Sequence, residues 1–79
     1  MRLDKWLKVS RLIKRRTIAQ EACDGGRVSL IGRTAKPSAE VKTGDVVEIS
    51  FGARTFRAEV LSVQETVKKD DAAAMYREI

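Results

Sequence analysis

The chain has 79 residues, a formal net charge of +5 at pH 7 and no histidine. This length suits one small domain, whose core is limited because short chains bury a smaller fraction of their surface. Without histidine the commonest general base and the commonest metal ligand are missing. The single Cys23 can form neither an intramolecular disulfide nor a zinc site of the usual soft ligands. We therefore expect no catalysis, no cofactor and no metal site.

The sequence also argues against membrane insertion and export. No apolar run approaches the roughly 20 residues that a membrane-spanning helix needs. The N-terminal residues carry charges without a following apolar stretch, so no signal peptide is expected. A lone cysteine agrees with a reducing compartment. These features favour a cytoplasmic protein.

Positive charge is concentrated in the first half of the chain. Residues 1–36 hold ten lysines and arginines against three acidic residues, a net charge of +7. Residues 37–79 hold six basic and eight acidic residues, a net charge of −2. A protein that binds a polyanion needs such a local excess of positive charge.

Residues 2–10 predict a short amphipathic helix, because Leu3, Trp6 and Leu7 recur at helical spacing. Trp6 could stack on a base, but its place in this apolar stripe favours the core.

A second helix is expected to begin near residues 14–17 and to end at Gly25-Gly26. Cys23 is expected in the core, since no histidine is present to deprotonate it. The predicted apolar side of this helix consists of Ile18, Ala19, Ala22 and Cys23.

The hydrophobic period changes to alternation after the second helix. Val28 and Leu30 predict a half-buried strand, and Gly32 and Gly44-Asp45 predict turns. Residues 46–63 predict a hairpin that turns at Gly52-Ala53. Its expected inward positions are Val47, Ile49, Phe51, Phe56, Ala58 and Val60.

Residues 68–79 return to a helical period, and Asp70 or Asp71 could cap the helix or complement its dipole. The whole pattern predicts a single α+β domain over residues 1–79, with a core of 1–63 and a helical extension of 64–79. The expected fold packs two N-terminal helices on a small, mostly antiparallel sheet and adds a C-terminal helix. Its apolar stripe is Ala72, Met75, Tyr76 and Ile79.

Seven basic residues lie within residues 2–16, and Asp4 is the only acid among them. Such runs are usually solvated faces that keep a protein soluble. Here acidic partners are scarce, and three cations fall at the start of the second helix, where they oppose the helix dipole at a cost of up to about 1 kcal/mol. Bound phosphate would offset this cost and the mutual repulsion of the cations. We therefore predict an RNA-binding face, with Arg16 as its strongest contact.

Two residues of this region have two interpretations each. Asp4 could stabilise the first turn of its helix, by roughly 0.5 to 1 kcal/mol. It could instead orient Lys8 or Arg11 toward phosphate. Lys36 could be a solvated loop charge or an edge of the basic face.

The residues that carry a family resemblance occur in a specific order. The string Arg2-Leu3-Asp4-Lys5-Trp6-Leu7, then Arg11, Arg16-Thr17-x-Ala19, Gly26-Arg27-Val28 and Gly44-Asp45, resembles the RNA-binding domain first known from ribosomal protein S-four, the alpha-L motif. The resemblance covers residues 1 to about 63 and implies an alpha-L fold whose helix pair binds structured RNA. One departure is Ile31-Gly32, where many members have Asn-Gly; a β-branched residue resists left-handed turn geometry.

The run of residues 8–17, the Lys36-Pro37-Ser38 segment and the closing Ala72, Met75 and Tyr76 resemble the RqcP family of stand-alone ribosome quality control proteins, which is related to the heat-shock protein fifteen family. This resemblance implies a non-catalytic factor that binds rRNA and peptidyl-tRNA on obstructed large ribosomal subunits. It also implies support of alanine tailing together with RqcH.

Two other functions remain open, namely recycling of blocked large subunits, as in the heat-shock relatives, and a protein-binding adaptor that uses the basic face. We expect a ribosome-associated monomer. The predicted RNA-binding residues are Arg2, Asp4, Lys5, Lys8, Arg11, Lys14, Arg15, Arg16 and Lys36.

Overall fold

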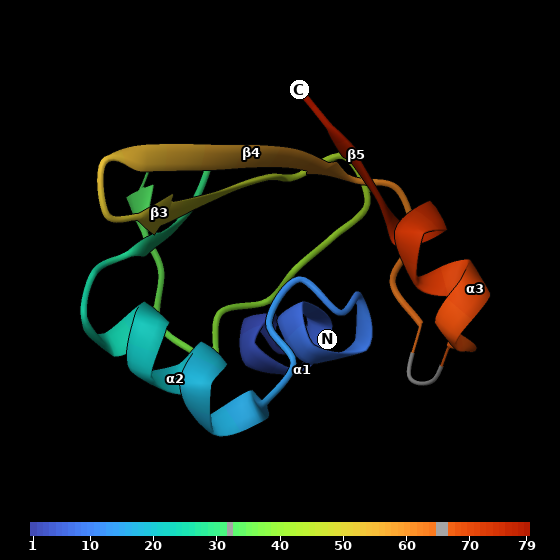
Figure 1. Cartoon of the computed structure of the whole chain (residues 1–79), viewed down its shortest axis with the longest axis horizontal. Coiled ribbons are helices and arrows are strands. Elements are labelled where there is room, and N and C mark those ends of the chain that lie inside the picture. Colours follow the sequence, from blue (N-terminus) through green and yellow to red (C-terminus); the bar gives the residue numbers. More distant parts are fainter. Residues whose placement is uncertain (32, 65–66) are drawn as a thin grey trace.

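The computed structural model describes residues 1–31, 33–64 and 67–79, and it places two helices against one face of an antiparallel sheet (Figure 1). Within these residues the sheet has five strands in the order β2-β1-β3-β4-β5. The predicted α+β class is confirmed. The helices are α1 (Leu3–Val9) and α2 (Arg16–Asp24), and the strands are β1 (Val28–Leu30), β2 (Arg33–Thr34), β3 (Val46–Phe51), β4 (Arg54–Val60) and β5 (Tyr76–Glu78).

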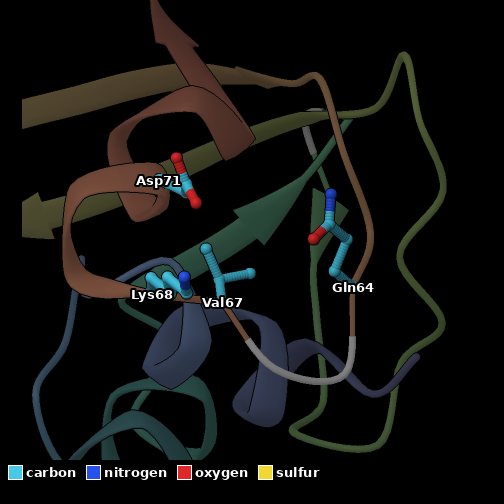
Figure 2. A pocket seen from close by; sticks show the side chains of 4 residues that line it. All are labelled: Gln64, Val67, Lys68 and Asp71. Carbon is cyan, nitrogen blue, oxygen red and sulfur yellow. The ribbon is translucent and has the colours of Figure 1, made fainter.

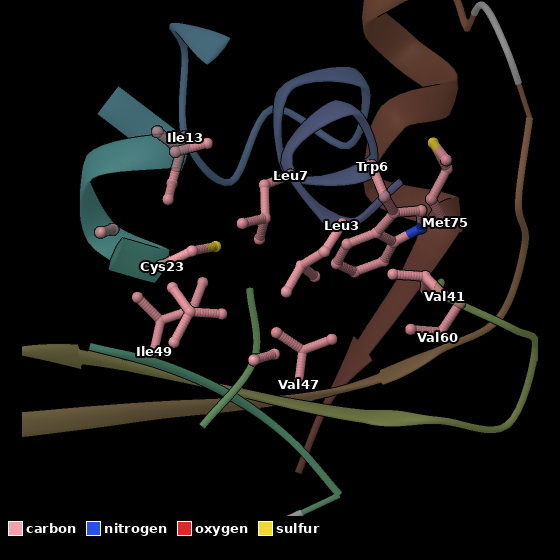
Figure 3. Close-up of a cluster of buried hydrophobic side chains, with 14 residues drawn as sticks. Leu3, Trp6, Leu7, Ile13, Cys23, Val41, Val47, Ile49, Val60 and Met75 are labelled. Atoms are coloured by element: carbon pink, nitrogen blue, oxygen red, sulfur yellow. The ribbon is translucent and has the colours of Figure 1, made fainter. Parts of the chain in front are cut away.

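The core fills the space between the helix pair and the sheet (Figure 3). Leu3, Trp6 and Leu7 are fully buried, as the helical spacing predicted. The indole Nε1 of Trp6 donates a hydrogen bond to the carbonyl oxygen of Ser62 at 3.0 Å, which ties α1 to the segment after β4. Cys23 is also buried in this core. The expectations for Trp6 and Cys23 are therefore confirmed.

One residue of α2 and one of β3 that were predicted to face inward lie at the surface instead. Ile18 is 46% exposed, because Ala19, Ala22 and Cys23 fill the part of α2 that meets the core and Ile18 falls at the margin of that stripe. Phe51 is 53% exposed, since it ends β3 beside the hairpin turn, where it pairs with Arg54.

The C-terminal segment differs from the predicted helix. The helix α3 covers only Lys69–Ala72 and continues as a 3-10 turn, η1 (Ala73–Met75), before the chain enters β5. Ala72 and Met75 are buried as expected, whereas Ile79 is exposed. Pairing of β5 with β4 satisfies backbone groups at an otherwise open sheet edge. Helical spacing alone could not reveal that edge.

A loop segment lies along the start of α1. The backbone N–H groups of Leu3 and Asp4 donate to the carbonyl oxygens of Ala39 and Pro37 at 2.8 and 3.1 Å. The first N–H groups of a helix have no acceptor within the helix, so these bonds satisfy two of them. The same bonds hold the 37–39 segment against the region of Asp4.

Within the described part of the chain, two non-glycine residues have left-handed backbone geometry. Arg11 follows α1 with φ 64°, and Ile31 follows β1 with φ 53°. The resemblance pointed to this geometry at Ile31, where the family commonly has asparagine. The predicted turn residue Gly32 lies outside the described residues.

Replacing Ile31 should stabilise the protein. Its side chain is exposed, so Ile31→Asn removes little packing while it relieves backbone strain. We expect the free energy of unfolding to rise by about 0.5 to 1 kcal/mol, measured by chemical denaturation. The matching rise in melting temperature is about 2 to 8 °C for a domain of this size.

A substitution that introduces strain at another left-handed position provides a control. Gly52 has φ 60° and nothing lies within 4 Å of a Cβ built there, so Gly52→Ala should destabilise through backbone strain alone. A loss of stability in both variants would contradict the assignment of strain at Ile31.

Candidate nucleic-acid interface

The carboxylate of Asp4 is buried between the two helices. Its side chain is 0% exposed, although it lies in the first turn of α1. The backbone N–H of Lys5 donates to Oδ1 at 2.7 Å, and the side-chain Nε2 of Gln20, on α2, donates to Oδ2 at 2.9 Å. A buried charge is costly unless it is hydrogen-bonded and paired, so these donors are needed to keep the carboxylate in place.

Two arginines share this carboxylate. Arg2 donates from Nε to Oδ1 and from Nη2 to Oδ2, both at 3.3 Å. Arg16 donates from Nη2 to Oδ1 at 3.5 Å, and its Nε lies 3.3 Å from Oδ2. The two side chains are 52% and 40% exposed. One negative charge therefore holds two guanidinium groups that still reach solvent, and positive charge remains for a ligand.

The ionisation of Asp4 follows from these contacts. Burial by itself raises the pKa of this carboxyl, but the hydrogen bonds from Gln20, Arg16 and the Lys5 N–H, with the charge of Arg16, hold it below its ordinary value of 3.8. Asp4 is therefore ionised at neutral pH.

The pKa of the Cys23 thiol is shifted in the opposite direction, upward. Burial, with the negative charges of Asp4 and Asp24, raises the pKa of its thiol to about 11. The thiol stays protonated at neutral pH and is a packing group rather than a nucleophile.

The geometry resolves the two interpretations of Asp4 in part. It does lie in the first turn of its helix, as one interpretation had it. The partners named in the other were wrong, because Asp4 contacts Arg2 and Arg16 rather than orienting Lys8 or Arg11. Arg16 lies twelve residues away on another helix, so spacing along one helix could not identify it.

The start of α2 matches the site expected for an anion. The helix begins at Arg16, within the predicted range, and Arg15 is its N-cap residue. No side chain caps it and no acid lies in its first turn. The N–H groups of its first turn precede the first internal donor, Ala19, and have no acceptor within the helix. Open N–H groups beside cations form a typical phosphate site.

The other predicted residues lie on the helix pair or on the segments next to it. Lys36 is exposed, and the neighbouring Pro37 bonds the Asp4 N–H, so Lys36 lies beside the start of α1. The exposed side chains that lead from α1 into the start of α2 belong to Lys8, Arg11, Lys14 and Arg15.

Gln20 is a residue that the sequence analysis missed. It carries no charge, and a search for basic residues passes over it. The available signal was its position four residues after Arg16, which places both on one side of α2.

The far face of the sheet carries a different arrangement of charge. Arg57 pairs with Glu48 and Arg77 pairs with Glu59, each at 2.6 Å. Both pairs join neighbouring strands. Arg57 and Arg77 of the sheet thus have an acid each, whereas Arg2 and Arg16 share a single acid.

Metal sites, membrane-spanning helices and pockets are the other features to consider among the described residues. Among residues 1–31, 33–64 and 67–79 no three potential metal ligands gather, and none of the helices there is long and apolar enough to cross a membrane. A pocket beside α3 has no cluster of like charges (Figure 2); it is lined by Gln64, Val67, Lys68 and Asp71.

Comparison with known proteins places the chain in a family. The S4 domain family model matches residues 1–47. The chain is 53% identical over 76 residues to the RQC P-site tRNA stabilizing factor of Bacillus subtilis (strain 168), covering 96% of this chain and 88% of that protein. It is 33% identical to the heat shock protein 15 homolog of Aeromonas salmonicida, covering 99% of this chain and 59% of that protein.

A solved structure shares the fold over the whole chain. The trimeric structure of Vibrio cholerae heat shock protein 15 superposes with a TM-score of 0.92 at 31% identity, covering 100% of this chain and 81% of that one.

Substitution of Asp4 should reveal its coupling to the helix pair. Asp4→Asn removes the charge that holds Arg2 and Arg16, and we expect the free energy of unfolding at pH 7 to fall by about 1 to 3 kcal/mol. Because the folded pKa is lowered, the wild-type advantage is present above the ordinary pKa and is lost as the pH falls through the folded value. Denaturation curves from pH 7 to pH 2 measure both effects. A difference between the proteins that is independent of pH would contradict the role of the charge.

Proposed function

The chain belongs to the S4-domain family of RQC P-site tRNA stabilizing factors, and from this premise we propose that it is a non-catalytic RNA-binding factor of ribosome quality control. In this proposal it binds rRNA and peptidyl-tRNA on obstructed large ribosomal subunits. The relatives are described as stabilising P-site tRNA, which fits a protein that holds a tRNA rather than one that transforms it.

The observation that carries the proposal is the pair of guanidinium groups on one buried carboxylate. Asp4 fixes Arg2 and Arg16 while both remain open to solvent. Arginine holds phosphate oxygens with a planar fork, and a side chain that is already positioned loses less entropy when it binds. The pair is therefore suited to a phosphate backbone of defined shape.

The start of α2 supplies the second part of the surface. Its uncapped N–H groups and the exposed Arg15 lie directly beside Arg16. A phosphate at this point would satisfy backbone donors and relieve the repulsion between neighbouring cations. We assign the RNA contacts to the predicted basic residues, with Arg16 as the strongest.

The cellular role that we propose is support of alanine tailing together with RqcH, in the cytoplasm and on the large subunit. Five curated relatives that are 51–53% identical over 96% of this chain carry the name of the quality-control factor, which supports this role. The second candidate is recycling of blocked subunits, and it is favoured by the likeness to heat shock protein 15 in sequence and structure.

Arg16→Ala should weaken RNA binding by about tenfold or more, because a charge-assisted contact is lost. The measurement is the affinity for purified large subunits that carry peptidyl-tRNA, over a series of salt concentrations. For the wild type we expect the logarithm of the affinity to fall linearly with the logarithm of the salt concentration, with a slope of about 0.7 to 0.9 per phosphate neutralised. The slope of the variant should be smaller by the contribution of about one phosphate.

Arg57→Ala is the matched control, since Arg57 is an exposed arginine whose partner is Glu48 on the far face of the sheet. It should bind as the wild type does. Equal losses in the two variants, or binding that barely depends on salt, would refute this interface.

The cellular role can be tested in a strain that lacks the gene. Alanine tails on stalled chains should disappear, reappear with the wild-type gene and reappear more weakly with Arg16→Ala. Persisting tails, together with accumulation of blocked large subunits, would favour recycling instead. Crosslinking and sequencing of bound RNA should yield rRNA and tRNA together, and scattered messenger RNA would contradict both roles.

A further inference from the structure

The shortest side-chain contact to Asp4 comes from a neutral residue. Gln20 Nε2 donates to Oδ2 at 2.9 Å, whereas the nitrogen atoms of Arg2 and Arg16 lie 3.3 to 3.5 Å from the same carboxylate. Charge-assisted contacts of this kind are usually 2.7 to 2.9 Å long. The Gln20 amide and the Lys5 N–H therefore make the shorter contacts with the carboxylate, and the two arginines make the longer ones.

We propose that Gln20 is a positioning residue for the RNA-binding site: its amide fixes the carboxylate of Asp4 and, through it, the two guanidinium groups that meet RNA. This inference rests on the proposed function and names a residue that contributes without charge. Gln20 lies on α2 and Asp4 on α1, so the bond also sets how the two arginines sit relative to one another.

The absence of charge on Gln20 matters for its role in positioning Asp4. A lysine or arginine here would compete with Arg2 and Arg16 for Asp4 and repel them. A glutamate would neutralise a guanidinium group that RNA needs. An amide supplies a donor for the carboxylate while leaving the charge of the site unchanged. Because it fixes the carboxylate before RNA arrives, less side-chain entropy is lost on binding.

The test replaces Gln20 with methionine, which has a similar shape but no donor. Gln20→Met should weaken binding to obstructed large subunits by about three- to tenfold, the effect of one lost hydrogen bond. Phe51→Met is the matched control, since it places the same side chain at an exposed position at the end of β3, outside the helix pair, and should leave affinity unchanged. If Gln20→Met does not fold, Gln20→Ala provides the same comparison. Unchanged affinity in a folded variant would overturn the proposal.

A mutant cycle separates positioning from direct contact with RNA. In the Arg2→Ala/Arg16→Ala background, Gln20→Met should have no further effect on affinity at low salt, because the groups that it positions are absent. A full additional loss would mean that Gln20 touches RNA itself, and it would overturn the positioning role.

A third measurement uses the free protein and does not depend on RNA. The carboxyl carbon of Asp4 can be titrated by NMR, and Gln20→Met should raise its pKa, since the Gln20 bond helps to lower it. An unchanged pKa would overturn the proposal even where affinity falls. Failure of the proposed function is distinguishable, because it would appear as absent RNA binding in the wild type.

Discussion

A single buried charge joins the two helices of this protein and determines where its positive groups lie. Asp4 receives donors from its own helix through the Lys5 N–H, from α2 through Gln20, and from the guanidinium groups of Arg2 and Arg16. A carboxylate without these donors would not remain ionised in such a place. The polar contacts between α1 and α2 and the positions of Arg2 and Arg16 therefore both depend on Asp4, beside the apolar packing of the two helices.

Features governed by neighbouring residues could be predicted from the sequence. The stripe of Leu3, Trp6 and Leu7 is buried as its spacing required, and α2 begins at Arg16, where the cations gather. The hairpin follows the same logic, because alternation along two adjacent strands identifies their inward faces, as at Val47 and Val60. In each case the periodicity of one element carries the information, and packing agrees with it.

Features that depend on distant partners could not be predicted. The segment after Met75 has a helical spacing of apolar residues, yet it pairs with β4 because a sheet edge is available there. Asp4 was predicted to stabilise its own first turn or to orient Lys8 or Arg11, and its partner Arg16 lies on another helix. Gln20 has no charge and matters only because the fold brings it to Asp4. The contacts that organise the candidate site are thus those with the least signal in the local sequence.

The backbone at Arg11 is strained although its side chain is not packed in the core. Arg11 directly follows Ser10, the C-cap residue of α1, at a position where helices often have glycine, and its φ of 64° is unfavourable for a residue with a side chain. Glycine would remove this strain, which costs on the order of 1 kcal/mol. Arginine brings no apolar burial in exchange, since the residue is exposed. Ile31 is exposed with the same geometry, so strain alone identifies no ligand; what distinguishes Arg11 is a positive charge that fits the RNA-binding face that we propose.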